Sequence, residues 1–135
     1  MRITLDFGAY LPRRAYDDDA GYDLCAKDAV TIAPHETVTV DTGVHIELPP
    51  HSAGFIRARS SMQRRGLISS GTIDVGYTGS IGVSITNCSD LAAHFQPGDR
   101  IAQLVIVPIM QPALTVVERL ADTERGSNGF GSTGV

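Results

Sequence analysis

The chain has 135 residues, of which 42% are hydrophobic and 19% are charged. This balance is typical of one globular domain with a buried core and excludes a disordered protein. The net charge of −4 argues against a general nucleic-acid binder, which needs a basic surface. The N-terminus carries no signal-peptide pattern, and the longest aliphatic run, residues 104–107, is too short to span a membrane, so we expect a cytoplasmic protein.

The two cysteines and four histidines offer no metal-binding pattern. Cys25 and Cys88 lack CxxC spacing, so reduced, buried thiols are expected. The histidines lack the i, i+4 pairing of helical metal sites, and His45 and His51 flank a diproline turn. A His-based metal site is therefore not expected.

Period-2 alternation of apolar and polar residues recurs along the chain, and helical periodicity is almost absent. Strands are expected at residues 2–6, 30–32, 37–40, 44–48, 54–59, 80–86, 101–107 and 114–117. Only residues 61–65 are compatible with a helical turn. Many short strands separated by Gly, Pro and Asn turns predict an all-β, jelly-roll-like single domain.

One stretch, Gly71-Thr72-Ile73-Asp74-Val75-Gly76-Tyr77-Thr78-Gly79, predicts a hairpin rich in glycine. Glycine lets a backbone approach a flat ligand and present its N–H and C=O groups. With Asp74 as its acid and Tyr77 as its aromatic ring, the hairpin suits a base and a sugar, with the carboxylate facing reactive water. An ordinary tight hairpin with a turn Asp is the alternative interpretation.

Basic residues and the C-terminal tail give two further signals. Arg57, Arg59, Arg64 and Arg65 fall in one short window, which suggests a local anion site on an acidic protein.

Residues 126–135 carry four glycines and should be mobile on their own. With Arg125 and Phe130, this tail suits an arm that clamps an anion and stacks on a ring; a disordered tail is the alternative.

Five stretches, in order along the chain, together resemble one family, the trimeric dUTP diphosphatases (dUTPases). They are Ala20-Gly21-Tyr22-Asp23-Leu24; Arg59-Ser60-Ser61 running on to Gly66-Leu67; Gly71-Thr72-Ile73-Asp74 with Tyr77 and Gly79; Gly98-Asp99-Arg100-Ile101-Ala102-Gln103-Leu104; and Arg125-Gly126 with Gly129-Phe130-Gly131-Ser132-Thr133-Gly134. Any one of these motifs is weak evidence, whereas all five in sequence are very specific.

The resemblance implies a jelly-roll (β-clip) homotrimer with active sites at the subunit junctions. Each site is expected to take the first, second and fourth motifs from one chain, the third from another, and the arm from a third chain. Residues 1–124 would form the β-domain and residues 125–135 a lid arm. The implied reaction is dUTP plus water giving dUMP and pyrophosphate, with Mg²⁺ bound to the triphosphate.

The resemblance also assigns residue roles. Asp74 would orient and activate the water that attacks the α-phosphorus. Tyr77 would pack under deoxyribose and leave no room for a 2′-hydroxyl. The backbone around Gly71, Thr72, Ile73 and Gly79 would bind the uracil edge.

Phosphate contacts are implied for the second, fourth and fifth motifs. The residues that would contact the phosphates are Arg59, Ser60, Ser61 and Gln103. The arm would close on the γ-phosphate through Arg125, Ser132 and Thr133. Phe130, with Gly131 beside it, would lie over the uracil. Mg²⁺ binds mainly through substrate phosphates and water, so no direct protein ligand is expected. Asp23 is expected to lie near the metal's water shell or to orient other groups, and residues 17–19 to form a solvated acidic loop.

The chain departs from the family pattern at a few positions. Gly76 stands where many members carry a second Asp, Ala58 replaces a common Pro and Ser61 a common Gly. Arg100 is expected to pair with Asp99 or another acid in a structural role.

Three rival functions remain. The related dCTP deaminases rely on a glutamate in the strand after the third motif, and residues 79–87 contain none. A regulatory protein that keeps the fold to contact partner proteins is the second rival. Asp74, Tyr77 and the arm argue against a loss of catalysis there and leave an added regulatory role open. A capsid-like β trimer, the third rival, would not need Asp74 or the arm.

Overall fold

The computed structural model describes residues 1–127, which are almost entirely β-structure. The strands are β1 (Arg2–Leu5), β2 (Gly21–Cys25), β3 (Val30–Ile32), β4 (Thr37–Asp41), β5 (Val44–Glu47), β6 (Ser52–Arg57), β7 (Leu67–Ile73), β8 (Gly82–Asn87), β9 (Ala93–Phe95) and β10 (Arg100–Pro108), and the helix α1 is Ser60–Arg64. No helix within residues 1–127 is long and apolar enough to cross a membrane.

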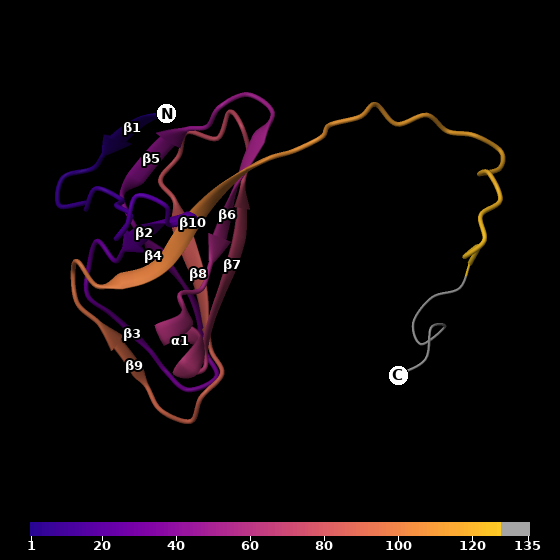
Figure 1. The fold of residues 1–135 in the computed structure, drawn as a ribbon. Coiled ribbons are helices and arrows are strands. Elements are labelled where there is room, and N and C mark those ends of the chain that lie inside the picture. The colour runs from indigo at the N-terminus through magenta and orange to yellow at the C-terminus, as the bar shows by residue number, and fades with distance from the viewer. Residues whose placement is uncertain (128–135) are drawn as a thin grey trace.

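The strands form one large curled sheet and two small ones (Figure 1). The large sheet has the order β2-β10-β6-β7-β8-β4, and β1 pairs with β5 and β3 with β9. Each of these pairings is antiparallel. The expected all-β single domain is confirmed, as is the helical turn, which α1 provides.

Alternation along the strands builds the core. In β8, Val83 and Ile85 are fully buried while their neighbours on the strand are more exposed, because successive side chains point to opposite faces. Leu24, Ile56 and Leu104 from neighbouring strands join the same apolar cluster. The burial of each such side chain stabilises the fold by roughly 2 kcal/mol. The curled sheet therefore surrounds one continuous apolar core.

Several expected elements differ from the structure. The expected strand at residues 114–117 is wrong: Leu114 and Val116 are almost fully exposed, and the chain after β10 runs away from the β-body (Figure 1). A strand needs a paired neighbour to satisfy its backbone groups, and this segment has none within residues 1–127. The strands β2 and β9 were not expected, and β2 contains no clear alternation. Of β7, only the end at residues 71–73 was anticipated, as part of the predicted hairpin.

The cysteines also differ from the expectation of buried thiols. Both are free, but Cys88 is exposed and Cys25 is only partly buried. Burial, followed by the nearby charge of Asp23, raises the pKa of the Cys25 thiol, which keeps it protonated and poorly nucleophilic at neutral pH.

Candidate active site

A polar pocket forms where three distant stretches of the chain meet. Its lining includes Arg59 and Ser60 at the start of α1, Gln103 on β10, and Asp23 and Asp19 around β2. The sheet order explains this meeting, because β10 lies between β2 and β6 and places Gln103 opposite Asp23 on one side. The structure therefore brings together the expected residues of the first, second and fourth motifs within one chain.

Asp23 is held between two arginines. Its Oδ1 lies 2.7 Å from Arg59 Nε and its Oδ2 lies 3.2 Å from Arg100 Nη1. The Asp23 side chain is only 18% exposed, so this pair of contacts compensates its buried charge. Two guanidinium groups lie beside the Asp23 carboxylate, and Asp19 is a second acid in the pocket lining. The guanidinium groups supply N–H donors that suit a polyanion.

The expected pairing of Arg100 with an acid is observed, and the acid is Asp23. Asp99 has a different role, because its Oδ2 accepts a hydrogen bond of 2.8 Å from the Gln96 backbone N–H. Arg100 thus links the fourth motif to the first.

The other basic residues do not join this pocket. Ser61 lines an adjacent hollow that contains Arg59, Arg65 and Phe95. The Arg65 guanidinium lies 5.4 Å from the centre of the Phe95 ring, a cation–π contact. The arginine window predicted from the sequence is therefore divided among separate surroundings, and only Arg59 enters the polar pocket.

The hairpin between β7 and β8 is open at its tip. The two strands pair only from Leu67↔Asn87 to Ser69↔Ile85. Beyond this point β7 pairs with β6 up to Gly54↔Ile73, and β8 pairs with β4 up to Asp41↔Gly82. The two strands separate because β7 continues along β6 while β8 continues along β4. Within the described chain, residues 70–73 therefore pair with a strand on one side only, and the backbone groups on their other side face no strand.

Asp74 and Tyr77 lie in the turn at this tip. The Tyr77 N–H donates to the Asp74 carbonyl oxygen over 3.1 Å, and both side chains are exposed. Gly76 has a φ of +95°, a conformation that L residues adopt only with strain. A glycine at this position avoids that strain.

The Tyr77 ring folds back over Gly79. Its hydroxyl donates to the Ser80 carbonyl oxygen over 2.9 Å, and a Cβ added to Gly79 would lie 2.5 Å from that hydroxyl oxygen. A side chain at this position would therefore displace the Tyr77 ring from its hydrogen bond with Ser80.

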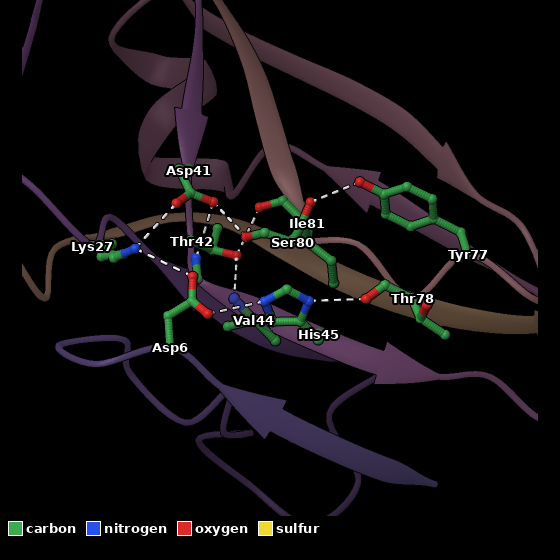
Figure 2. A network of polar contacts seen from close by, with 11 residues as sticks. Asp6, Lys27, Asp41, Thr42, Val44, His45, Tyr77, Thr78, Ser80 and Ile81 are labelled. Carbon is green, nitrogen blue, oxygen red and sulfur yellow. Dashed lines mark hydrogen bonds and ion pairs between the residues drawn. The ribbon is translucent and has the colours of Figure 1, made fainter.

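A polar network beneath the tip was not expected from the sequence (Figure 2). Ser80 donates to Asp41, Lys27 lies 3.4 Å from Asp41 and 3.3 Å from Asp6, and Asp6 lies 3.2 Å from His45. Hydrogen bonds lower the pKa of both carboxyl groups, chiefly that from Ser80 for Asp41 and that from Lys27 for Asp6. These contacts join residues 14 to 39 positions apart, so no local pattern predicts them.

The polar pocket and the hairpin tip lie at opposite ends of β6. Ile73, next to Asp74, pairs with Gly54, whereas Arg59 follows the other end of that strand. At about 3.3 Å per residue, the five steps along the chain from Gly54 to Arg59 span about 17 Å.

Other expected site residues lie outside this description or away from the body. Arg125 belongs to the segment that leaves the body after β10 (Figure 1). Phe130, Gly131, Ser132 and Thr133 lie outside the described residues. Within residues 1–127 no group of three or more His, Cys, Asp or Glu side chains could hold a metal ion. The carboxylates that line the pocket are those of Asp19 and Asp23.

Comparison with known proteins identifies relatives along the whole chain. The dUTPase family model matches residues 8–134. The deoxyuridine 5'-triphosphate nucleotidohydrolase of Picosynechococcus sp. is 43% identical over 136 residues, covering 98% of this chain and 96% of the relative. The enzyme of the same name from Anaeromyxobacter sp. is 46% identical over 128 residues, covering 92% of this chain and 87% of the relative.

Solved structures give the same result. The Staphylococcus bacteriophage 80alpha dUTPase with dUPNHPP has a TM-score of 0.93 and 32% sequence identity, covering 99% of this chain and 98% of its own. A mutant dUTPase from phage phi11 of S. aureus, described with a structural Mg(II) ion, has a TM-score of 0.83 and 29% identity, covering 90% of this chain and 98% of its own.

Proposed function

The chain belongs to the dUTPase family, and we propose that it hydrolyses dUTP to dUMP and pyrophosphate. The observation that carries this proposal is the polar pocket, where Arg59, Ser60 and Gln103 converge from distant parts of the sequence. A guanidinium, a hydroxyl and an amide together supply the donors that a triphosphate needs. Ser61, in the adjacent hollow, would contact a phosphate from the other side of Arg59.

Asp74 is proposed to orient and activate the water that attacks the α-phosphorus. Within residues 1–127, no hydrogen bond or ion pair occupies its exposed carboxylate, so the carboxylate is available to accept a proton from water. As the nucleophile attacks, the bond from the α-phosphorus to the bridging oxygen breaks and pyrophosphate leaves.

The open hairpin is proposed to bind the nucleoside. The backbone of Gly71, Thr72 and Ile73 on one side and of Gly79 on the other would form hydrogen bonds with the uracil edge, for which the separation of β7 from β8 leaves room. A backbone that fits uracil's oxygen and N–H pattern would disfavour cytosine's amino group. The Tyr77 ring would pack against deoxyribose and exclude a ribose 2′-hydroxyl.

Mg²⁺ is the proposed metal, held chiefly by the substrate's phosphates. When bound, it would neutralise charge on the triphosphate and polarise its oxygens. Asp23 and Asp19 line the pocket and fit contacts with a hydrated ion, although Asp23 already binds two arginines. Asp23 therefore has two roles in this proposal, to hold Arg59 and to face the water shell of the metal.

We propose that the active site is shared within a homotrimer. The positions of Asp74 and Arg59 at opposite ends of β6 support a site in which one chain supplies the hairpin and another the phosphate pocket. The arm, with Arg125, Phe130, Gly131, Ser132 and Thr133, would come from a third chain. This arm, its boundary at residue 124 and the cytoplasmic location stay predictions.

Pyrophosphate release tests the proposed function directly. The purified chain is incubated with dUTP, dCTP, dTTP and UTP, with and without Mg²⁺, and pyrophosphate and ammonia are measured. We expect pyrophosphate from dUTP alone, in a Mg²⁺-dependent reaction. Ammonia from dCTP would instead identify a deaminase, and dUTP binding without any product would identify a binding module with the family fold.

A further inference from the structure

His45 lies between the body of the protein and the tip of the hairpin (Figure 2). Its Nδ1 is 2.9 Å from the Thr78 carbonyl oxygen, and its Nε2 is 3.2 Å from Asp6 Oδ1. His45 is on β5, Asp6 follows β1, and Thr78 is in the turn after β7. One imidazole ring therefore connects three segments that are distant in sequence.

Both ring nitrogens face acceptors. A carbonyl oxygen has no proton to donate, and an ionised carboxylate has none either. Because its hydrogen bonds with Lys27 and His45 lower the pKa of Asp6, this carboxyl group is ionised at neutral pH. Both contacts are satisfied at once only when each nitrogen carries a proton, which is the imidazolium state.

The charges around His45 come from several elements. Asp6 contacts the ring directly, and Asp41 at the end of β4 adds a more distant negative charge. Lys27 bridges these two carboxylates, and the mutually paired Arg2 and Glu47 line the groove beside the ring. The hydrogen bond to Thr78 is the largest cause that raises the pKa of His45, and that to Asp6 adds to it, against the opposing effect of desolvation.

Thr78 is the point at which this contact affects the hairpin. Its neighbours are Tyr77 and Gly79, which we place against the sugar and the base. The other ties lie further inward, where Ser80 donates to Asp41 and the Ile81 N–H donates to the Val44 carbonyl oxygen over 2.8 Å. The Thr78 carbonyl is therefore the outermost tie between the turn and the body.

We propose that His45 is a positioning residue for the nucleoside-binding hairpin, and that its imidazolium fixes Thr78 so that the turn is ready for substrate. This inference rests on the proposed function, because it concerns the same hairpin. When the ring loses a proton, one of its two contacts is lost. The charge-assisted contact with Asp6 is the stronger one, so the remaining proton stays on Nε2, and Thr78 is released.

The direction of the pH effect follows from the raised pKa. The stabilisation is fully present below about pH 6.5, the ordinary pKa of histidine, and is lost as pH rises through the higher pKa of the folded protein. Losing one hydrogen bond of this kind is expected to raise KM for dUTP by about threefold to tenfold, with little change in kcat.

A first test needs no enzyme activity. NMR follows three signals in the full-length chain: the His45 ring and the backbone amides of Thr78 and Gly79. The pH is raised from about 5.5 to about 9, which begins below the ordinary histidine pKa of about 6.5 and ends well above it. We expect all three signals to change with one common midpoint above 6.5. Amide signals that do not follow the His45 ring would overturn the proposal, whatever the outcome of the dUTP assay.

A second test separates the two contacts by substitution. His45→Asn places an uncharged amide donor near the position of Nδ1, and His45→Gln places one near the position of Nε2. In the Asn variant the Thr78 contact does not titrate, so its KM should not rise with pH as the wild-type KM does. The ratio of the variant's KM to the wild-type KM should therefore fall as pH rises. The Gln variant should show, at every pH, the raised KM that the wild type reaches only at high pH. Asp6→Asn should remove the break in KM, because the Asn amide can donate to a neutral Nε2 and leave the Nδ1 proton on the Thr78 contact.

His94→Asn is the matched control. His94 lies on β9, where its Nδ1 is 3.0 Å from Thr31 Oγ1, outside the hairpin network. This variant should keep the wild-type dependence of KM on pH. Ionisation of dUTP itself affects both proteins equally, so it cancels when the KM of a variant is divided by that of the wild type. Equal profiles for wild type, His45→Asn and Asp6→Asn would overturn the role of His45 while leaving dUTP hydrolysis intact.

Discussion

Two aspartates illustrate how surroundings give the same side chain different uses. Asp23 is mostly buried and bridges Arg59 and Arg100, so its charge serves to hold cations in place. Asp74 is exposed in a turn, and only its backbone carbonyl is engaged, by Tyr77. The second arrangement is the one that leaves a carboxylate open to water and substrate.

Replacing Asp74 tests its proposed role. Asp74→Asn should lower kcat by about 100-fold or more, because the water loses its general base, while dUTP binding is retained. Steady-state kinetics and binding of a non-hydrolysable analogue are the measurements. Asp28→Asn, at an exposed site away from the pocket, is the control, and normal turnover in Asp74→Asn would refute the role.

Tyr77 is the other residue of the tip with a discrete prediction. Tyr77→Ala should increase UTP hydrolysis relative to dUTP by about tenfold, since the ring no longer excludes a 2′-hydroxyl. Tyr77→Phe keeps the ring and removes only the hydroxyl's bond to Ser80, so its UTP to dUTP ratio should match that of the wild type. An unchanged ratio in the Ala variant would remove the argument for sugar selection.

At the scale of elements, strand order creates the pocket. The central position of β10 between β2 and β6 brings the first, second and fourth motifs to one edge, and α1 begins there with Ser60. Arg59 and Arg100 reach Asp23 from different elements. The pair therefore offers a comparison between Arg59, which we propose contacts the substrate, and Arg100, for which we propose a structural role.

Arg59→Gln should lower kcat/KM for dUTP by about 100-fold, because a charged phosphate donor is lost. Arg100→Gln should have a small kinetic effect and lower the free energy of unfolding by about 1 kcal/mol or less, since the Arg100 side chain is 53% exposed. Steady-state kinetics and urea denaturation distinguish the two variants. Equal kinetic losses would mean that both arginines contact substrate.

At the scale of the whole molecule, the two regions that we propose form the active site lie apart in one chain. The hairpin tip and the polar pocket are separated along β6. Residues 110–127 extend from the body with exposed side chains such as Met110, Leu114 and Val116 (Figure 1). Exposed apolar side chains of this kind favour contact with another chain.

Removing residues 125–135 tests the arm. The truncated chain should keep its melting temperature and its oligomer size, because β10 ends at Pro108 and the core lies before it. Its kcat/KM for dUTP should fall by about 100-fold or more, since closure over the substrate is lost. Light scattering, thermal melting and pyrophosphate release are the measurements, and unchanged kcat/KM would refute the arm's role.

Motif residues and period-2 alternation are local properties of the chain, so the family, the all-β class and most strand positions could be predicted without a structure. Which residues meet could be seen only in the folded chain. The pairing of Asp23 with two arginines, the exchange of partners by β7 and the link from Asp6 through His45 to Thr78 each join residues far apart in sequence. These contacts depend on strand order and register, which follow from packing of the whole sheet rather than from any one segment.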